Sequence, residues 1–203
     1  MTVDAFGTIV ELCDPVEPLA RVLAARGVER GRAAIERAFA AEAEYYVRHS
    51  LRGRDEASLE ALRRDCAEVF LHGVHANLDP GEFAPDYVAA LEFRVIEGTI
   101  ETLDSLRSAG LRLACVGNWD RSLESVLERL GVAGRFEAIV SSAVAGVEKP
   151  DPAIFLLALD RLRAAPDRAL HIGDRDTDRE GASAAGLRFE PVPLATLPAR
   201  LGL

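Results

Sequence analysis

Polar side chains that could do chemistry follow four short apolar runs of the sequence. They are Asp4, the pair Gly117 and Asn118, Lys149, and Asp174 with Asp178. Lys149 is the only lysine among 24 basic residues, and its compact ammonium acts as a point charge, unlike the planar guanidinium of arginine. If the apolar runs are strands of one parallel sheet, their carboxyl ends share an edge at which ligands bind. The residue types then predict a site in which carboxylates face a single ammonium.

From residue 98 onward, apolar runs of strand length alternate with helical patterns. Strands are predicted over residues 111–116, 137–142, 169–172 and 187–192. Helices are predicted over residues 98–109, from Asp120 to Gly131, after the pair Asp151-Pro152, and over 181–185. The opening residues 3–8 have the pattern of a strand that ends in a turn. This alternation is typical of an α/β fold whose parallel sheet is covered by helices on both faces.

The segment 14–94 has a different composition and pattern: it is rich in Ala, Glu and Arg, and its apolar residues have helical spacing. Asp14 and Pro15 are suited to start its first helix, and two longer helices are predicted over 32–48 and 56–72. Residues 77–86 are predicted as a turn before a last short helix, and no strand is predicted in the segment. The chain is therefore divided into a core of residues 1–13 and 95–203 and a helical insert of residues 14–94.

Composition and charge exclude several classes of function. Hydrophobic residues make up 49% of the 203 positions, enough for a packed core, which excludes a disordered chain. The net charge of −9, without a cluster of bases, argues against nucleic-acid and membrane-surface partners. No apolar stretch approaches the length of a membrane span, and the three cysteines lack metal-type spacing. We expect a cytoplasmic protein with reduced thiols that acts on a small molecule, and the sequence predicts no oligomeric state.

Four motifs resemble, in order, those of the haloacid dehalogenase-like (HAD) hydrolase superfamily. They are Asp4-Ala5-Phe6-Gly7-Thr8, Val116-Gly117-Asn118, Lys149-Pro150-Asp151-Pro152, and Gly173-Asp174 with Asp178 and Gly181-Ala182. The resemblance spans the predicted core, and the helical insert lies where that family places its cap, between the first and second motifs. It implies a Rossmann-like parallel sheet with an inserted helical cap. The nearest branch mixes dehalogenase-like proteins with small-molecule phosphatases.

The resemblance implies a role for each acidic residue of the site. Asp4 would be the nucleophile that forms a covalent aspartyl-phosphate, which water then hydrolyses. Asp4, Asp174 and the carbonyl oxygen of Phe6 would hold Mg²⁺, and Asp178 would orient a metal-bound water. The acidity of the segment 173–178 favours a metal, because these carboxylates and Asp4 would otherwise repel one another and an anionic substrate.

The remaining motif residues would bind the phosphate. Lys149 would neutralise the nucleophile and the transferring group as a point charge. Thr8, Gly117 and Asn118 would hold the anion through hydroxyl and backbone N–H groups, although a turn hydroxyl explains Thr8 equally well.

Two positions depart from the phosphatase pattern. Phe6 stands where a second Asp usually protonates the leaving group, and Gly117 stands where a Ser or Thr hydroxyl is expected. The first hypothesis is a Mg²⁺-dependent phosphatase of a small phosphorylated metabolite, slow or limited to good leaving groups. An aromatic residue at position 6 also resembles metal-independent 2-haloacid dehalogenases, in which halide departs without a proton. A third hypothesis is a binding protein that keeps the fold without catalysis.

Other polar residues are expected to be structural. His171, inside an apolar strand, is predicted to be a hydrogen-bonded core residue, and Trp119 and Asp120 a packing side chain and a helix cap. His72 and His75 have no acidic or thiol partner near them in the sequence, so no metal site is predicted there.

Overall fold

The computed structural model describes all 203 residues and divides into two compact units. The core unit contains Met1–Glu11 and Phe93–Leu203, and the helical unit contains Leu12–Glu92. Both junctions lie two residues earlier than the sequence-based boundaries of 13 and 95. No helix of either unit combines the length and the apolar character that crossing a membrane requires.

The core unit is built on a five-stranded sheet of order β5-β4-β1-β6-β7, in which every neighbouring pair is parallel. The strands are β1 (Thr2–Val3), β4 (Ala114–Gly117), β5 (Ala138–Ser141), β6 (Leu170–Gly173) and β7 (Arg188–Pro191). The central strand β1 is only two residues long, and Val3 is paired with Cys115 on one side and Ile172 on the other. The order confirms the predicted α/β fold and places the end of β1 between the ends of β4 and β6.

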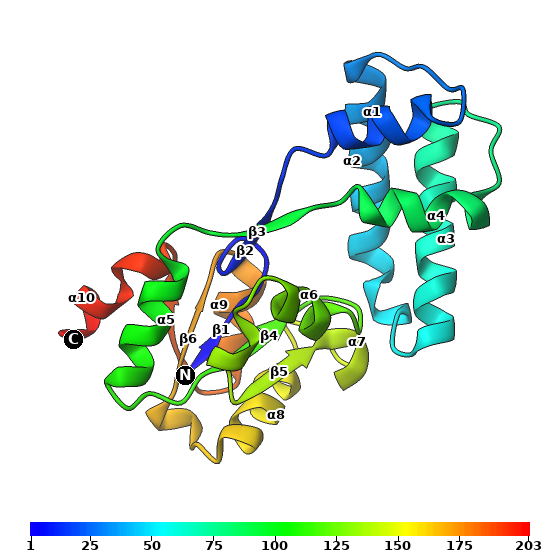
Figure 1. Cartoon of the computed structure of the whole chain (residues 1–203). Coiled ribbons are helices and arrows are strands. Elements are labelled where there is room, and N and C mark those ends of the chain that lie inside the picture. The colour runs from blue at the N-terminus through cyan, green and yellow to red at the C-terminus, as the bar shows by residue number, and fades with distance from the viewer. The chain divides into compact units, whose positions relative to one another are not determined.

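Helices cover both faces of this sheet (Figure 1). The helices are α5 (Thr99–Ser108), α6 (Leu123–Arg129), α7 (Ser142–Ala145), α8 (Pro152–Leu162), α9 (Asp176–Ala184) and α10 (Leu197–Leu201). Short 3-10 turns lie at Ala133–Arg135, Pro166–Arg168 and Leu194–Thr196. Apolar residues of α5 and α6 pack with Val3 and Ile172, and those of α8 pack with Ala114 and Val116 on the opposite face. The core therefore forms two apolar layers around the strands.

Two helix starts show how local side chains set the elements next to the site. Asp151 accepts a hydrogen bond from the backbone N–H of Ala153 at 2.9 Å, and Pro152 follows it, as predicted. The helix predicted over residues 181–185 in fact begins at Asp176. This prediction was too short because the Asp178 carboxylate accepts the N–H of Arg175 at 3.2 Å and so closes the first turn.

The helical unit has its own apolar core, to which four helices contribute (Figure 1). They are α1 (Val16–Ala24), α2 (Arg32–His49), α3 (Glu56–Gly73) and α4 (Pro80–Ala89), with a 3-10 turn at Ser50–Arg52. The turn predicted over residues 77–86 was wrong, since most of it belongs to α4. Asp79 accepts the N–H of Glu82 at 2.9 Å and Pro80 occupies the first turn, so the pair starts a helix.

A two-stranded sheet of β2 (Val10–Leu12) and β3 (Phe93–Val95) lies where the chain enters and leaves the helical segment. Strand β3 includes residues 93 and 94, so the expectation of no strand over 14–94 was wrong at its end. Next to these two strands, the backbone N–H of Cys13 donates to the carbonyl of Glu92 at 2.8 Å. An exposed ion pair between Glu11 and Arg94, at 2.8 Å, adds a side-chain contact.

Candidate active site

Asp4, Lys149 and Asp178 meet at the carboxyl edge of the core sheet. The Lys149 ammonium contacts the Asp4 carboxylate and donates to Asp178 Oδ1 at 2.5 Å. Asp4 and Lys149 are each 5% exposed, and Asp178 is fully buried. Charges buried this deeply are stable only when they are paired, so the three side chains form one electrostatic unit.

The elements of the core hold Asp4 and Lys149 in place. Asp4 directly follows β1, and its backbone N–H donates to the carbonyl of Ile172 on β6 at 2.9 Å. Lys149 lies in the loop between α7 and α8, and Asn118 fixes this loop. The Asn118 side chain donates to the Lys149 carbonyl at 2.9 Å and accepts the Lys149 N–H at 2.8 Å. Both ends of the Asn118 amide are thus used to position Lys149.

A tight turn after Asp4 brings Thr8 and Gly7 against the acidic residues of the site. The Thr8 hydroxyl donates to Asp4 Oδ2 at 3.1 Å and is buried. Gly7 has φ of +84°, and a Cβ at this position would collide with the carboxylate of Asp174. The glycine is therefore required both for the turn and for the approach of Asp174.

Three carboxylates could hold a metal ion. Oxygens of Asp4, Asp174 and Asp178 lie within 4.8 Å of one another, and Asp174 is exposed. Three carboxylates and the Lys149 ammonium sum to a formal charge of −2, which one divalent cation would balance. Carboxylate oxygens are the ligands that Mg²⁺ prefers, so the residues fit this ion.

Asp178 is less available than Asp174 as a metal ligand. Its Oδ1 accepts from Lys149 and is 2.9 Å from His171 Nε2, and its Oδ2 accepts the N–H of Arg175 at 3.2 Å. Asp4 is engaged in a similar way by Lys149 and Thr8, so the exposed Asp174 is the most accessible of the three carboxylates. The roles of Asp4, Asp178 and the Phe6 carbonyl as ligands stay predictions.

The protonation states follow from burial and pairing. Burial raises the pKa of Asp4, and the charge of Lys149 opposes this. Burial acts to lower the pKa of Lys149, but the charges of Asp4 and Asp178 outweigh it and raise the pKa. Burial acts to raise the pKa of Asp178, yet the His171 hydrogen bond and the Lys149 charge hold it at about 2. Asp178 is ionised and Lys149 protonated near neutral pH.

The two departures from the phosphatase pattern have clear structural settings. Gly117 is the buried last residue of β4, and a Cβ there would lie 3.1 Å from Ala5 Cβ and 3.2 Å from Leu123. A hydroxyl side chain would crowd the strand end. Phe6 is 39% exposed, and its ring centroid is 6.3 Å from that of Trp119. A half-exposed aromatic ring, with no proton to donate, therefore lies two residues after Asp4.

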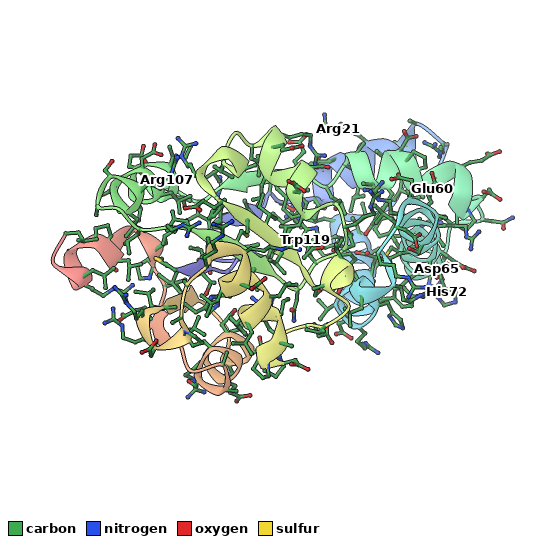
Figure 2. All side chains as sticks on the ribbon, turned by 90° about the horizontal axis from the view of Figure 1, so that it is seen from below. Arg21, Glu60, Asp65, His72, Arg107 and Trp119 are labelled. Carbon is green, nitrogen blue, oxygen red and sulfur yellow. The ribbon has the colours of Figure 1, made fainter.

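Trp119 is a packing side chain as predicted, whereas the predicted cap residue Asp120 is not the N-cap of α6, because that position is Ser122. Trp119, labelled in Figure 2, is 6% exposed and packs on Phe93 with ring centroids 5.1 Å apart. Asp120 Oδ1 accepts the N–H of Ser122 at 2.7 Å in the turn that precedes α6.

His171 is a hydrogen-bonded core residue as predicted, but sequence reasoning missed that it contacts the site. Its Nε2 is 2.9 Å from Asp178 Oδ1, and its Nδ1 is 2.9 Å from the Thr2 hydroxyl. The signal that could have found this contact is Gly173, two residues further along β6. A Cβ at Gly173 would collide with Asp178, so the glycine marks where Asp178 of α9 approaches the strand.

The helical unit contains a separate pocket between α2 and α3. Asp65 and His72 of α3 both line it and are labelled in Figure 2, and Tyr45 of α2 forms part of the opposite wall. Asp65 is held by Arg52 at 2.9 Å, so its charge is already paired.

Comparisons with known proteins agree with the fold and the motifs. A haloacid dehalogenase-like hydrolase domain-containing protein 3 of Mus musculus is 40% identical over 103 residues, or 50% of this chain and 41% of that protein. A phosphoglycolate phosphatase of Rhodospirillum rubrum is 31% identical over 176 residues, or 86% of this chain and 65% of that protein. The chain thus spans less than two thirds of the length of either relative.

A solved structure and a family model complete the comparison. A HAD-hydrolase from Bacillus subtilis bound to magnesium has the same fold, with a TM-score of 0.76 and 17% identity, and the match covers 100% of this chain and 97% of that one. The family model for haloacid dehalogenase-like hydrolases matches residues 2–186. The motif-based prediction is therefore confirmed, and the chain belongs to the haloacid dehalogenase-like hydrolase family.

Proposed function

We propose that this hydrolase is a Mg²⁺-dependent phosphatase of a small phosphorylated metabolite that works through an aspartyl-phosphate on Asp4. The observation that supports it is the buried contact of Asp4 with the chain's only lysine, beside two further carboxylates within 4.8 Å. The similarity to the Rhodospirillum rubrum phosphoglycolate phosphatase favours a phosphatase over other hydrolases. The helical unit is assigned as the cap that selects the substrate.

The proposed reaction has two steps. A carboxylate oxygen of Asp4 attacks phosphorus, the new O–P bond forms, and the bond from phosphorus to the leaving oxygen breaks. Water then attacks the same phosphorus, which releases phosphate and restores the Asp4 carboxylate. When bound by Asp4 and Asp174, Mg²⁺ would supply charge neutralisation between the carboxylates and the phosphate.

The other residues prepare Asp4 for this attack. Lys149 cancels one negative charge at the nucleophile and stands where charge develops on the transferring group. Thr8 orients the carboxylate through its hydrogen bond to Oδ2. Asn118 holds the Lys149 main chain, so the ammonium needs little reorganisation when substrate arrives.

The test is a panel of phosphate esters assayed with Mg²⁺ and with a chelator. We expect turnover that requires Mg²⁺ and that Asp4→Asn abolishes. The matched control is Asp176→Asn, because Asp176 is exposed and paired only with Arg179 at 2.6 Å. Undiminished turnover in Asp4→Asn would exclude the aspartyl-phosphate mechanism.

One observation favours a second candidate, a 2-haloacid dehalogenase. Phe6 offers an apolar surface and no proton beside Asp4, which suits a halide leaving group. Release of halide from a 2-haloacid in the presence of chelator is the result expected for this candidate. Binding of Mg²⁺ and phosphate without turnover of any substrate would instead favour a binding protein.

A further inference from the structure

A row of buried polar side chains extends from the lysine into the core, away from the reacting carboxylate. It runs from Lys149 through Asp178 on α9 and His171 on β6 to Thr2 on β1. Thr2 and His171 are direct cross-strand neighbours in the parallel register, and both are fully buried. Each link is 2.9 Å or shorter, so the row is a continuous hydrogen-bonded network.

The direction of each hydrogen bond follows from the chemistry of the partners. An ionised carboxylate can only accept, so His171 Nε2 carries the proton that is donated to Asp178. A neutral imidazole has one N–H, which leaves Nδ1 as an acceptor for the Thr2 hydroxyl. Burial lowers the pKa of His171, in agreement with a neutral ring.

His171 is held so that it presents Nε2 in one orientation. The edge of its ring meets Phe155 of α8 at a centroid distance of 4.9 Å and an angle of 81°. Thr2 fixes the opposite end of the ring through Nδ1. The ring therefore has a single arrangement in which it donates to Asp178.

The His171 donor matters for Asp178 because its carboxylate lies between Lys149 and two further carboxylates. Its Oδ1 accepts from both Lys149 and His171, while one of its oxygens also lies within 4.8 Å of those of Asp4 and Asp174. Without the His171 N–H, the Lys149 ammonium itself and the backbone N–H of Arg175, at 3.2 Å, would be the remaining donors to the carboxylate. Lys149 would then lose a fixed partner opposite Asp4.

We propose that His171, supported by Thr2, is a positioning residue that fixes the Lys149 ammonium against Asp4 by orienting the Asp178 carboxylate. The effect on turnover rests on the proposed function, whereas the effect on Lys149 does not. A residue that only filled core space would be replaceable by an apolar side chain of similar size without moving the lysine.

Because Lys149 is the only lysine, selective labelling with 15Nζ-lysine gives one side-chain ammonium signal. In the wild-type protein we expect slow exchange of its protons with water, since Lys149 is 5% exposed and bonded to two carboxylates. His171→Leu should shift this signal and speed the exchange. His171→Gln, whose amide N–H can reach the same oxygen, should restore it.

Three further measurements make the test decisive. Ile172→Val, a methyl deletion at the next residue of β6, is the control and should leave the ammonium signal unchanged. Thr2→Val removes the hydroxyl at constant shape, so it tests the network even if His171→Leu fails to fold. In the wild-type protein the His171 15N shifts should report a proton on Nε2, and a proton on Nδ1 would overturn the proposal.

In an active enzyme, His171→Leu should lower kcat by about 10- to 100-fold with little change in KM, the scale of a misplaced catalytic group. His171→Gln should recover most of this loss. An unchanged Lys149 signal in folded His171→Leu would refute the positioning role. Absence of phosphatase activity in all variants would instead count against the proposed function, because the lysine signal needs no substrate.

Discussion

At the scale of single residues, Phe6 would decide which leaving groups the proposed phosphatase can handle. Phe6 is 39% exposed, and its ring lies beside that of Trp119. It belongs to the same turn as Gly7, against which the Asp174 carboxylate packs. A phosphate ester with a basic leaving group needs a proton as the bond to phosphorus breaks. Phe6 cannot supply one, so we expect the proposed phosphatase to favour substrates with acidic leaving groups.

We expect Phe6→Asp to raise kcat/KM for alkyl phosphates by about 100-fold, the lower range of general acid catalysis. Aryl phosphates should gain much less, because their leaving groups need no proton. The measurement is kcat/KM across esters of graded leaving-group pKa. Phe6→Leu is the control for lost aromatic contact, and an equal gain in both variants would contradict the argument.

Single residues were also where the sequence was most informative about the site. Asp4, Lys149 and Asp178 come from three distant segments, and their positions after apolar runs were enough to predict convergence at one edge. The partners of Asn118 could not be predicted, because its two bonds to the Lys149 main chain depend on the path of the loop between α7 and α8. The contact between His171 and Asp178 could not be predicted either, because it depends on how closely α9 packs against β6.

At the scale of elements, the crossing of α2 and α3 depends on one glycine. A Cβ at Gly73 would lie 2.7 Å from the Cβ of Ala38 and 2.9 Å from its Cα, closer than atoms can pack. We expect Gly73→Ala to lower the free energy of unfolding by about 1–3 kcal/mol, the usual cost of overpacking. Urea unfolding measures it. Gly31→Ala, where a Cβ meets nothing, is the control, and equal effects would contradict this explanation.

A buried acid in the same helices makes stability depend on pH. Glu42 of α2 is 4% exposed beside Cys66 of α3 and Tyr87 of α4, and burial raises its pKa. An acid with a raised pKa in the folded state stabilises the fold when protonated, and this contribution is lost as pH rises above its ordinary value of 4.5.

We therefore expect Glu42→Gln to gain stability relative to the wild-type protein as pH rises from about 4.5 toward neutral. The difference should be smallest at acidic pH, where Glu42 is protonated in both states. Urea unfolding at a series of pH values measures the difference. Exposed Glu44→Gln is the matched control on α2, and parallel pH curves for Glu42→Gln and the wild-type protein would show that the buried carboxylate is not responsible.

Element boundaries were predicted least well where a side chain starts a helix within a polar stretch. The start of α9 at Asp176 depends on Asp178 accepting the Arg175 N–H, and the start of α4 depends on Asp79 and Pro80. Both segments were rich in turn-forming residues, so local composition pointed to loops. The apolar strands β4, β5 and β6 were found because burial on both faces leaves a continuous apolar run.

At the scale of the whole molecule, the strand order makes the site. Because β1 lies between β4 and β6, Asp4 is flanked by the Asn118 and Asp174 segments. This arrangement gathers three carboxylates, and so an excess of negative charge, at one edge of the sheet. The stability of the entire chain should therefore respond to a divalent cation.

Mg²⁺ should stabilise the wild-type protein by about 2.7 kcal/mol when the ion is at 100 times its dissociation constant. The midpoint of its thermal unfolding should rise accordingly. Asp174→Asn should abolish this response, because a ligand and one negative charge are removed. In the presence of chelator the same variant should be more stable than the wild-type protein, since less repulsion remains among the carboxylates. Exposed Asp176→Asn should behave as the wild-type protein does. An equal Mg²⁺ response in Asp174→Asn would place the ion elsewhere.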